Sequence, residues 1–455
     1  MKSKIKLSQD QEQAVDLIKK FIKDKDENIF LLQGHAGTGK TTILKIIIQH
    51  LIEQRKQFCL CAPTHRAKSV LENSTGCKAT TLHKLLSMQP NINIFDLDFS
   101  FLKFKSKGIT MFPTNGVVVC DEASMINDEL YGLLCDYADI TNSKLIFVGD
   151  KAQLQAVGDR SISKVFNVEN HFSLTKIHRQ NKDNDIFDVL NILRKEPIKN
   201  WIEYSNLKSL EMYIDNPGKF LDDLTNDVKI MLDKGDVNHT KLIAFRNVIV
   251  QGMNKFIRSR LFDDIDVINE TEIITGYSNF KQNGYEFYNS SDYIILESKY
   301  KKRRLPYCNI EVPGFDLKVL DTGFNIKVDL YVLDHSELDI TDLFEIAANI
   351  ESIRLDAVTA SNSNRKYKAS QLWNKYYTLT ESFATMCDLD YDGRIIKSKS
   401  LDYGYCSTIH KVQGVTLDNV YIDMGDVQRC LNREQLRQLQ YVGLSRTSNN
   451  VKMYL

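Results

Sequence analysis

Short apolar runs alternate with helical patterns over the first 180 residues of the chain. NIFLLQ (28–33), VVVC (117–120) and KLIFVG (144–149) are continuous apolar runs with the length of buried strands. KTTILKIIIQHLIEQ (40–54) instead spaces its Ile and Leu residues along one face of a helix. Because strands that alternate with helices form parallel sheets, we predict an α/β domain over residues 1–180.

A second α/β domain follows and is interrupted by an insertion. KLIAF (241–245) predicts a strand, and a similar pattern returns from Tyr405 to a strand at VKMYL (451–455). Between them, one stretch alternates apolar and polar residues, which is typical of a small β domain, and the next is helical. The insertion of about 120 residues has the size of a domain. We predict the second α/β domain at 181–279 plus 401–455, with the insertion at 280–400.

A shorter segment, 87–115, also breaks the alternation of strands and helices. It is rich in aromatic residues and carries Pro90 and Pro113 near its ends. We predict a β-hairpin or small subdomain inserted in the first domain.

The composition excludes some classes of protein but does not indicate a function. Lys plus Arg and Asp plus Glu each number 59, so the net charge is zero and the surface as a whole is not basic, although a local basic groove is compatible with this balance. The sequence contains no run of 18 apolar residues, so it predicts no membrane span. The first residues lack the apolar core of a signal peptide. The nine cysteines lack metal-binding spacing. We expect reduced thiols in an intracellular, cytoplasmic protein.

The stretch GHAGTGKTT (34–42) has the spacing of a phosphate-binding loop. It lies between a predicted strand and a predicted helix, the context that this motif requires. Glycines let backbone N–H groups approach phosphate oxygens, and a helix N-terminus attracts anions. Lys40 is expected to contact the β- and γ-phosphates, and the Thr41 hydroxyl to bind Mg²⁺. The alternative is a chance glycine-rich turn, which this combined context disfavours.

Two further predicted strands end in polar residues suited to ATP hydrolysis. Asp121 follows the run VVVC and can hold Mg²⁺, while Glu122 can deprotonate the attacking water. After KLIFVG, Gln153 can sense the γ-phosphate. Polar residues at the carboxyl ends of parallel strands meet at one edge of the sheet, so the sequence predicts an ATPase.

Hydroxyl and imidazole groups after neighbouring strands predict contacts to a nucleic-acid backbone. Thr64 and His65 lie in APTHRA, and His83 lies in TTLHKLL. Near the other end of the chain, STIHKVQG with Thr408 and His410 also stands out just before a predicted strand, without a role that the residues alone assign. A structural hydrogen bond is the alternative for each histidine. Arg446, at the end of a predicted helix, and Arg179 can stabilise the transferring phosphoryl group, although a surface arginine is the default interpretation for either.

Together these motifs resemble superfamily 1 DNA helicases. The set LSQDQEQA, GHAGTGKTT, APTHRA, TTLHKLL, VVVCDEAS, VGDKAQL, LTKIHRQ, STIHKVQG and YVGLSRT occurs in the order of that superfamily. APTHRA is similar to the motif of the B-type branch, which includes RecD-like and Dda-like enzymes, and the layout resembles the Dda-like helicases of T-even phages. The resemblance covers nearly the whole chain and is vague between residues 270 and 400.

The resemblance implies two RecA-like parallel-sheet domains that bind ATP and Mg²⁺ and drive movement 5′→3′ along single-stranded DNA. It implies adenine recognition by Gln11, arginine fingers at Arg179 and Arg446, and coupling through Gln153. Residues implied in nucleotide binding are Gly34, Gly37, Thr38, Gly39, Lys40, Thr41, Thr42, Gln413 and Gly414. Residues implied in DNA binding are Pro63, Thr64, His65, His83, Asn247, Thr408 and His410.

The resemblance also assigns the insertions. The hairpin in the first domain would be a pin that splits a forked duplex, within 91–107, with Phe95, Phe99 and Phe101 as stacking candidates. The insertion in the second domain would be an SH3-like barrel with a helical extension. A monomer is implied, with a single-strand-binding protein or replication proteins as partners, and a phage gene expressed in a bacterial host as the source.

The sequence departs from the family at three places. Gln155-Ala156 replaces two prolines, which leaves that turn less rigid. Cys406 replaces a small alanine, and a common Asn-Gly turn of the insertion corresponds to Asn289-Ser290.

Several alternatives stay open at this point. A different phosphate-loop enzyme, a DNA clamp without a motor, and a translocase that displaces proteins without robust unwinding are the rivals. The basic run KYKKRR (299–304) fits a solvated hairpin, a DNA contact or a localisation signal. The Trp- and Tyr-bearing stretch 371–383 fits core packing or base stacking.

Overall fold

A computed structural model describes residues 7–91, 103–106, 111–155, 162–176, 185–363, 365–391 and 393–455. The chain divides into two compact units. The first comprises Met1–Phe220, Ile243–Arg246 and Thr408–Leu455, and the second comprises Leu221–Leu242 and Asn247–Ser407.

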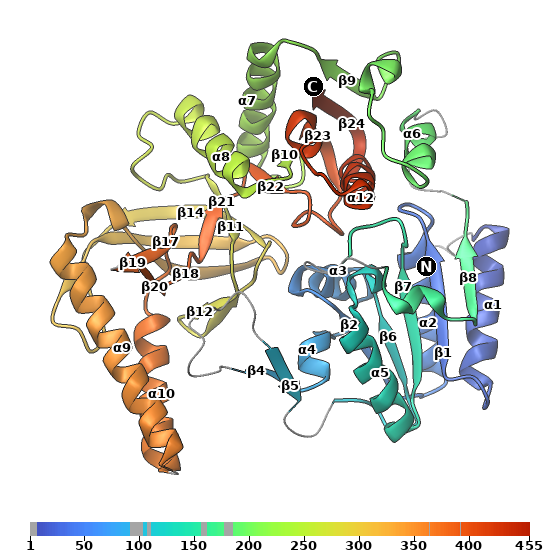
Figure 1. The fold of residues 1–455 in the computed structure, drawn as a ribbon, viewed down its shortest axis with the longest axis horizontal. Coiled ribbons are helices and arrows are strands. Elements are labelled where there is room, and N and C mark those ends of the chain that lie inside the picture. Colours follow the sequence, from blue (N-terminus) through green and yellow to red (C-terminus); the bar gives the residue numbers. More distant parts are fainter. Residues whose placement is uncertain are drawn as a thin grey trace. The chain divides into compact units, whose positions relative to one another are not determined.

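The first unit contains a six-stranded sheet of order β3-β2-β6-β7-β1-β8, with all neighbours parallel (Figure 1). Three of these strands confirm the runs predicted to be buried strands. The bounds are β1 (Ile29–Gly34), β2 (Phe58–Ala62), β3 (Ala79–Thr81), β6 (Val117–Cys120), β7 (Lys144–Gly149) and β8 (His171–Leu174).

Helices cover both faces of this sheet because successive strand residues point in opposite directions. Val117 and Val119 belong to one apolar core, with residues of α1 and α2. Val118 and Cys120 belong to the core on the opposite face, with residues of α4 and α5. The helices are α1 (Gln9–Lys23), α2 (Lys40–Glu53), α3 (His65–Thr75), α4 (Leu82–Leu85) and α5 (Asp128–Thr141). Short 3₁₀ helices along the whole described chain are η2 (Ala123–Met125), η3 (Lys164–Asn167), η4 (Trp201–Tyr204) and η5 (His335–Glu337).

A second sheet has the order β22-β10-β23-β24-β9, and β24 is parallel to both β23 and β9. The boundary between the two units passes through β10 and β22. This sheet confirms the predicted return of α/β structure after the insertion. Its strands are β9 (Leu210–Tyr213), β10 (Thr240–Ala244), β22 (Cys406–Thr408), β23 (Leu417–Asp423) and β24 (Thr447–Tyr454). The helices in the same stretches of the chain are α6 (Ile186–Leu193), α7 (Pro217–Lys234), α8 (Asn247–Leu261), α11 (Met424–Val427) and α12 (Arg433–Leu444).

In the first unit, β4 (Met88–Asn91) and β5 (Lys103–Ser106) form an antiparallel pair within the segment predicted to be inserted. Phe95, Phe99 and Phe101 lie outside the described residues.

The second unit contains an antiparallel sheet of order β18-β17-β14-β11-β21. Two of its strands, β11 and β21, lie just outside the predicted bounds of 280–400. The strands are β11 (Ile273–Gly276), β14 (Asp292–Tyr300), β17 (Gly314–Asp321), β18 (Ile326–Leu333) and β21 (Leu401–Tyr403), accompanied by the pairs β12 (Phe280–Gln282) with β13 (Tyr285–Phe287), β15 (Arg303–Arg304) with β16 (Glu311–Val312), and β19 (Leu389–Tyr391) with β20 (Arg394–Lys397). Two long helices, α9 (Ile340–Asn362) and α10 (Lys366–Thr380), pack side by side (Figure 1).

The assignment of a family Asn-Gly turn to Asn289-Ser290 stays a prediction. Asn283-Gly284 joins β12 to β13, and both residues have positive φ, 51° and 78°. Two consecutive left-handed residues are what a tight two-residue hairpin requires, so this dipeptide forms such a turn. Among the residues that the structure describes, no helix is both long and apolar enough to cross a membrane.

Candidate nucleotide site and nucleic-acid-binding residues

The predicted phosphate loop joins β1 to α2, and α2 begins at Lys40. Gly37 and Gly39 adopt left-handed backbone angles, with φ of 83° and 87°, which glycine tolerates without a steric cost. The Lys40 ammonium donates hydrogen bonds to the carbonyl oxygens of Gly34 (2.6 Å) and His35 (3.1 Å). The lysine is therefore held over the loop whose N–H groups would surround a phosphate.

Gln11 contacts this loop from α1. Its Nε2 donates to the carbonyl of Thr38 at 3.0 Å, and its Oε1 accepts from the backbone N–H of Ser8 at 3.0 Å. A Cβ at Gly39 would lie 2.3 Å from Gln11 Nε2, so Gly39 leaves the space that this side chain occupies. The structure thus brings Gln11 to the phosphate loop, whereas its role in adenine recognition stays a prediction.

The acidic pair follows β6. Asp121 Oδ1 accepts from the backbone N–H of Glu122 at 2.9 Å. Burial raises the pKa of Asp121, and burial together with the charge of Asp121 raises the pKa of Glu122 to about 7. Lys40 and Arg446 act in the opposite direction on Glu122. A carboxyl group with a pKa near neutrality suits a general base.

The backbone at Glu122 is unusual. Its φ and ψ are 53° and 46°, a left-handed conformation that is uncommon for a residue with a long side chain. It caps the 3₁₀ helix η2, and a Cβ at Gly149 would lie 3.0 Å from the Ala123 Cβ and 3.2 Å from the Ala123 nitrogen. Gly149 is thus needed for the close approach of β7 to this turn. Strain of this kind often marks functional residues.

Two glutamines from different sheets meet beside the acidic pair. Gln413 Nε2 lies 3.2 Å from Gln153 Oε1, 3.3 Å from Ser124 Oγ and 3.3 Å from the Leu154 carbonyl. A Cβ at Gly414, which has a φ of 82°, would lie 3.5 Å from Glu122 Oε1. Gln153, Gln413 and Gly414 were all predicted site residues, and the structure brings them together.

Arg446 follows α12 and is only 3% exposed. Its Nε donates to the Val442 carbonyl at 3.1 Å, and its Nη2 donates to Ser445 Oγ at 2.8 Å. The guanidinium thus lies against the end of its own helix, near enough to Glu122 to lower the pKa of that carboxyl group. Arg179, the second predicted arginine finger, lies outside the described residues.

The sequence gave no role to Asp150 or Tyr441, although they lie in the motifs VGDKAQL and YVGLSRT. Asp150 follows β7, is 1% exposed, and accepts a hydrogen bond from the Tyr441 hydroxyl at 2.8 Å. His35 Nδ1 of the phosphate loop lies 3.6 Å from Asp150 Oδ1. Burial acts to raise the pKa of Asp150, but His35 and Lys40 outweigh it and lower the value to about 2. Asp150 therefore stays ionised between the loop and α12.

The predicted DNA-contacting residues of the first sheet lie after two neighbouring strands. Ala62 of β2 is in register with Thr81 of β3. Thr64 follows Pro63 and caps α3 by accepting from the Ala67 N–H at 3.1 Å, and His65 begins that helix. His83 lies in α4, where burial lowers its pKa and so favours a neutral imidazole. The two loops occupy one sheet edge, as predicted.

The remaining candidates come from the second sheet and its surroundings. Thr408 ends β22 and is 7% exposed. The His410 ring centroid lies 6.4 Å from that of Phe245, and burial lowers the pKa of His410. Asn247 begins α8 and is exposed, but it belongs to the second unit.

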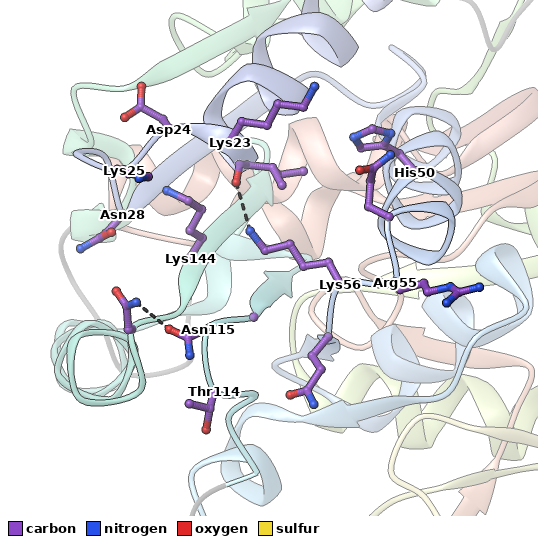
Figure 2. A pocket seen from close by; sticks show the side chains of 15 residues that line it. Lys23, Asp24, Lys25, Asn28, His50, Arg55, Lys56, Thr114, Asn115 and Lys144 are labelled. Atoms are coloured by element: carbon purple, nitrogen blue, oxygen red, sulfur yellow. Dashed lines mark hydrogen bonds between the residues drawn. The ribbon is translucent and has the colours of Figure 1, made fainter.

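A pocket of about 850 Å³ lies at the opposite, amino-terminal ends of β1, β6 and β7 (Figure 2). Figure 2 shows Lys23, Lys56 and Lys144 around it. Lys56 donates to the Ile22 carbonyl at 3.1 Å, and Lys144 donates to the Glu27 carbonyl. Since two of these ammonium groups bind local backbone, the pocket has a structural explanation and is not the candidate active site.

Comparisons with known proteins agree with this geometry. An AAA domain family model matches residues 6–211, and a UvrD-like helicase C-terminal domain model matches 403–454. The ATP-dependent DNA helicase dda of Enterobacteria phage T4 is 25% identical over 97% of each chain, and an uncharacterized protein of Acanthamoeba polyphaga mimivirus is 25% identical over 97% of this chain and 98% of its own.

Solved structures agree on the fold. The Pif1 helicase from Candida albicans has a TM-score of 0.52 and 17% identity, and the match covers 99% of this chain and 94% of that one. A Bacteroides Pif1 bound to single-stranded DNA has a TM-score of 0.52 and 15% identity, covering 99% and 92%. Each of the two parallel sheets with its helices therefore has the RecA-like fold found in these helicases.

The family models and relatives support a superfamily 1 helicase of the B-type branch. Within that branch, the chain is similar to the Dda helicase of phage T4 over nearly its whole length.

Proposed function

We propose that this protein is an ATP-driven motor that moves 5′→3′ on single-stranded DNA and unwinds duplex DNA. The observation that carries the proposal is the meeting of residues from both parallel sheets beside the phosphate loop. Glu122 and Gln153 follow strands of the first sheet, whereas Gln413, Gly414 and Arg446 lie in connections of the second. A site built from two domains can couple hydrolysis to their relative movement.

The described residues fit ATP and Mg²⁺. The left-handed glycines leave the loop amides free of side chains, and Lys40 already lies across the loop. Thr41 and Asp121 would hold Mg²⁺, which neutralises phosphate charge when bound. Glu122 would take the proton from the attacking water. Arg446 would face the developing charge, and Arg179 would do so from the other side. Gln153 and Gln413 would report on the γ-phosphate, with Gly37, Thr38 and Thr42 completing the loop.

DNA is the proposed track. The relative from phage T4 is named an ATP-dependent DNA helicase, and the Bacteroides Pif1 structure contains single-stranded DNA. Hydroxyl and imidazole groups of Thr64, His65, His83, Thr408 and His410 would contact the backbone, together with Pro63 and Asn247. The β4–β5 hairpin would be the pin that splits the duplex, with Phe95 or Phe99 stacking on a base. The antiparallel sheet with α9 and α10 would be the SH3-like insertion with its helical extension.

The same proposal covers the setting of the protein. It would act as a monomer inside a cell, on forked DNA, with a single-strand-binding protein or replication proteins nearby.

Two matched forked duplexes test the proposal, one with only a 5′ single-stranded tail and one with only a 3′ tail. ATP-dependent unwinding from the 5′ tail, with ATPase activity stimulated by single-stranded DNA, is the expected result. Unwinding from the 3′ tail alone would contradict the polarity. DNA-stimulated ATPase without unwinding of either substrate would instead favour a translocase that displaces bound proteins. ATPase at its full rate without DNA would favour an unrelated phosphate-loop enzyme.

A further inference from the structure

The solvent face of α10 carries cations and tyrosines with no acidic residue. Between residues 366 and 378, nine positions are exposed, and all are lysine, tyrosine or uncharged polar residues. Tyr367 is 78% exposed and Tyr377 is 46% exposed. The exposed positions are Lys366, Tyr367, Lys368, Ser370, Gln371, Asn374, Lys375, Tyr377 and Thr378.

The opposite face of α10 accounts for its packing. Ala369 and Leu379 are buried, and the Trp373 Nε1 donates to Ser361 Oγ at 3.3 Å. Trp373 and Tyr376 are half-buried, and their rings make an edge contact with centroids 5.6 Å apart. Tyr376 therefore packs against an apolar core of this unit, and Trp373 contacts α9 through Ser361. Tyr367 stays on the outside, whereas the exposed Tyr377 also contacts the Trp373 and Tyr376 rings, at 6.1 and 5.5 Å between centroids.

A turn from the β insertion extends this surface. Tyr307, between β15 and β16, is 50% exposed and has a φ of 62°. A bulky aromatic residue in the left-handed region is a strained outlier, and such residues often mark functional positions. Lys375 Nζ lies 5.6 Å from the centre of the Tyr307 ring. Lys375 thus lies between this turn and α10. We call the exposed cations and tyrosines of the two elements the α10 surface: Tyr307, Lys366, Tyr367, Lys368, Lys375 and Tyr377.

The neighbouring basic run 299–304 is a weaker candidate because acidic residues neutralise much of it. Asp316 pairs with Lys301 at 3.7 Å and also with Arg303. Glu297 lies 3.4 Å from Lys299. The run therefore has a structural role in its own hairpin. The lysines of α10 have no carboxylate among the exposed positions of their helix face.

We propose that the α10 surface is a second contact for single-stranded DNA, outside the motor domains. Ammonium groups interleaved with exposed aromatic rings are the chemistry that holds an unpaired strand, since lysines contact phosphates and rings stack on bases. A partner helix would instead require aliphatic side chains, which this face lacks. The inference rests on the proposed function, because it adds a contact to a protein that already binds this strand.

The charge on this surface is tested in the full-length protein. Lys366→Ala, Lys368→Ala and Lys375→Ala are combined, and binding of a fluorescent oligothymidine is measured by anisotropy over a series of salt concentrations. We expect affinity at low salt to fall about tenfold or more, and the slope of log K against log salt to decrease by about 2, since each phosphate contact on a single strand contributes about 0.7.

A matched control removes the same charge elsewhere. Lys229, Lys234 and Lys327 are exposed, lie outside the α10 surface and have no assigned role. The combined alanine variant at these three positions is expected to bind like the unaltered protein. Equal binding by the two triple variants would overturn the inference. ATPase at saturating DNA should be unchanged in both, since neither set contacts nucleotide.

Stacking is tested at the tyrosines. Tyr307→Ala and Tyr367→Ala should each weaken binding about tenfold, whereas the phenylalanine variants should stay near the unaltered value because the ring is kept. Oligonucleotides containing iododeoxyuridine, crosslinked by light and mapped by mass spectrometry, should mark Tyr307, Tyr367 or Tyr377. Crosslinks confined to other residues, with no loss in the alanine variants, would overturn the inference and favour a protein partner for this surface.

The outcomes separate this inference from the proposed function. If the unaltered protein fails to bind DNA and its ATPase is not stimulated by DNA, both fail. If it unwinds forked DNA while the α10 variants match their controls, only this inference fails.

Discussion

The Tyr441 hydroxyl donates a 2.8 Å hydrogen bond to Asp150 Oδ2, and both side chains are buried. Tyr441 belongs to α12 beside the second parallel sheet, and Asp150 follows β7 of the first. Asp150 also accepts from the Ala152 N–H at 3.0 Å and lies beside His35 of the phosphate loop. A single carboxylate thus connects the predicted phosphate loop to α12.

The Tyr441→Phe variant tests this link. Loss of a hydrogen bond to a buried charged group costs about 1.5–3 kcal/mol, so we expect kcat for DNA-stimulated ATPase to fall about tenfold. The KM for ATP should change little, since Tyr441 does not belong to the loop. Fewer base pairs should be unwound for each ATP consumed. Tyr421→Phe is the control, because Tyr421 is equally buried and its hydroxyl meets Lys452 instead. Equal kinetics for the two variants would contradict the link.

The raised pKa of Glu122 predicts a pH-dependent stability. Between its ordinary value of 4.5 and about 7, the folded protein holds a proton that the unfolded chain has lost. The free energy of unfolding must therefore decrease as pH rises through this interval. Glu122→Gln removes this ionisation. In EDTA without nucleotide, the variant should melt above the unaltered protein at pH 8, with a difference that shrinks towards pH 5.

The same variant should bind ATP but fail to hydrolyse it. A melting difference that is constant with pH would contradict the assigned pKa, and retained hydrolysis would remove Glu122 as the base.

Arg446 is expected to act in hydrolysis rather than in binding. Arg446→Ala should reduce kcat by about 10³ or more and leave nucleotide affinity within a few fold. The structure adds that this variant should also melt at a lower temperature, because the buried guanidinium binds the end of α12. Arg446→Lys keeps the charge and loses the planar fork, so its rate should also be low. Hydrolysis at the normal rate, measured below the melting temperature, would exclude a finger role.

Thr64 has two expected effects that can be separated. Its side chain caps α3, and removal of such a cap costs about 1 kcal/mol of stability. Thr64→Ala should show this loss and also bind single-stranded DNA more weakly. Asn127→Ala removes the equivalent cap of α5, where Oδ1 accepts from the Leu130 N–H at 2.8 Å. That control should lose stability alone. Thr64→Ser should retain both properties, and equal DNA binding by all three would leave Thr64 a purely structural residue.

Local sequence patterns predicted the parts of the fold that depend on local physics. VVVC forms β6 because a β-branched apolar run fits the middle of a sheet. Helix α2 begins at Lys40 because Gly39 before it has left-handed backbone angles, which a right-handed helix does not contain. The family resemblance placed Gln153 and Gln413 separately at the nucleotide site, and the structure adds the contact between them. The Asp150–Tyr441 bond was not expected, because nothing in the residues near Asp150 indicates a partner that is distant in sequence. The Asn283-Gly284 turn was overlooked although its dipeptide is a strong hairpin signal.

The position of β24 in the second sheet has a consequence for synthesis of the protein. This strand lies between β23 and β9, yet β9 ends at Tyr213 and β24 begins at Thr447. During synthesis, β9 emerges from the ribosome before its partner β24 has been made. Translation of the residues between them takes more than ten seconds at about 5–20 residues per second. The apolar edge of β9 is exposed during that time. Chaperone capture, and sensitivity of yield to translation speed, are expected for this half of the motor more than for the first.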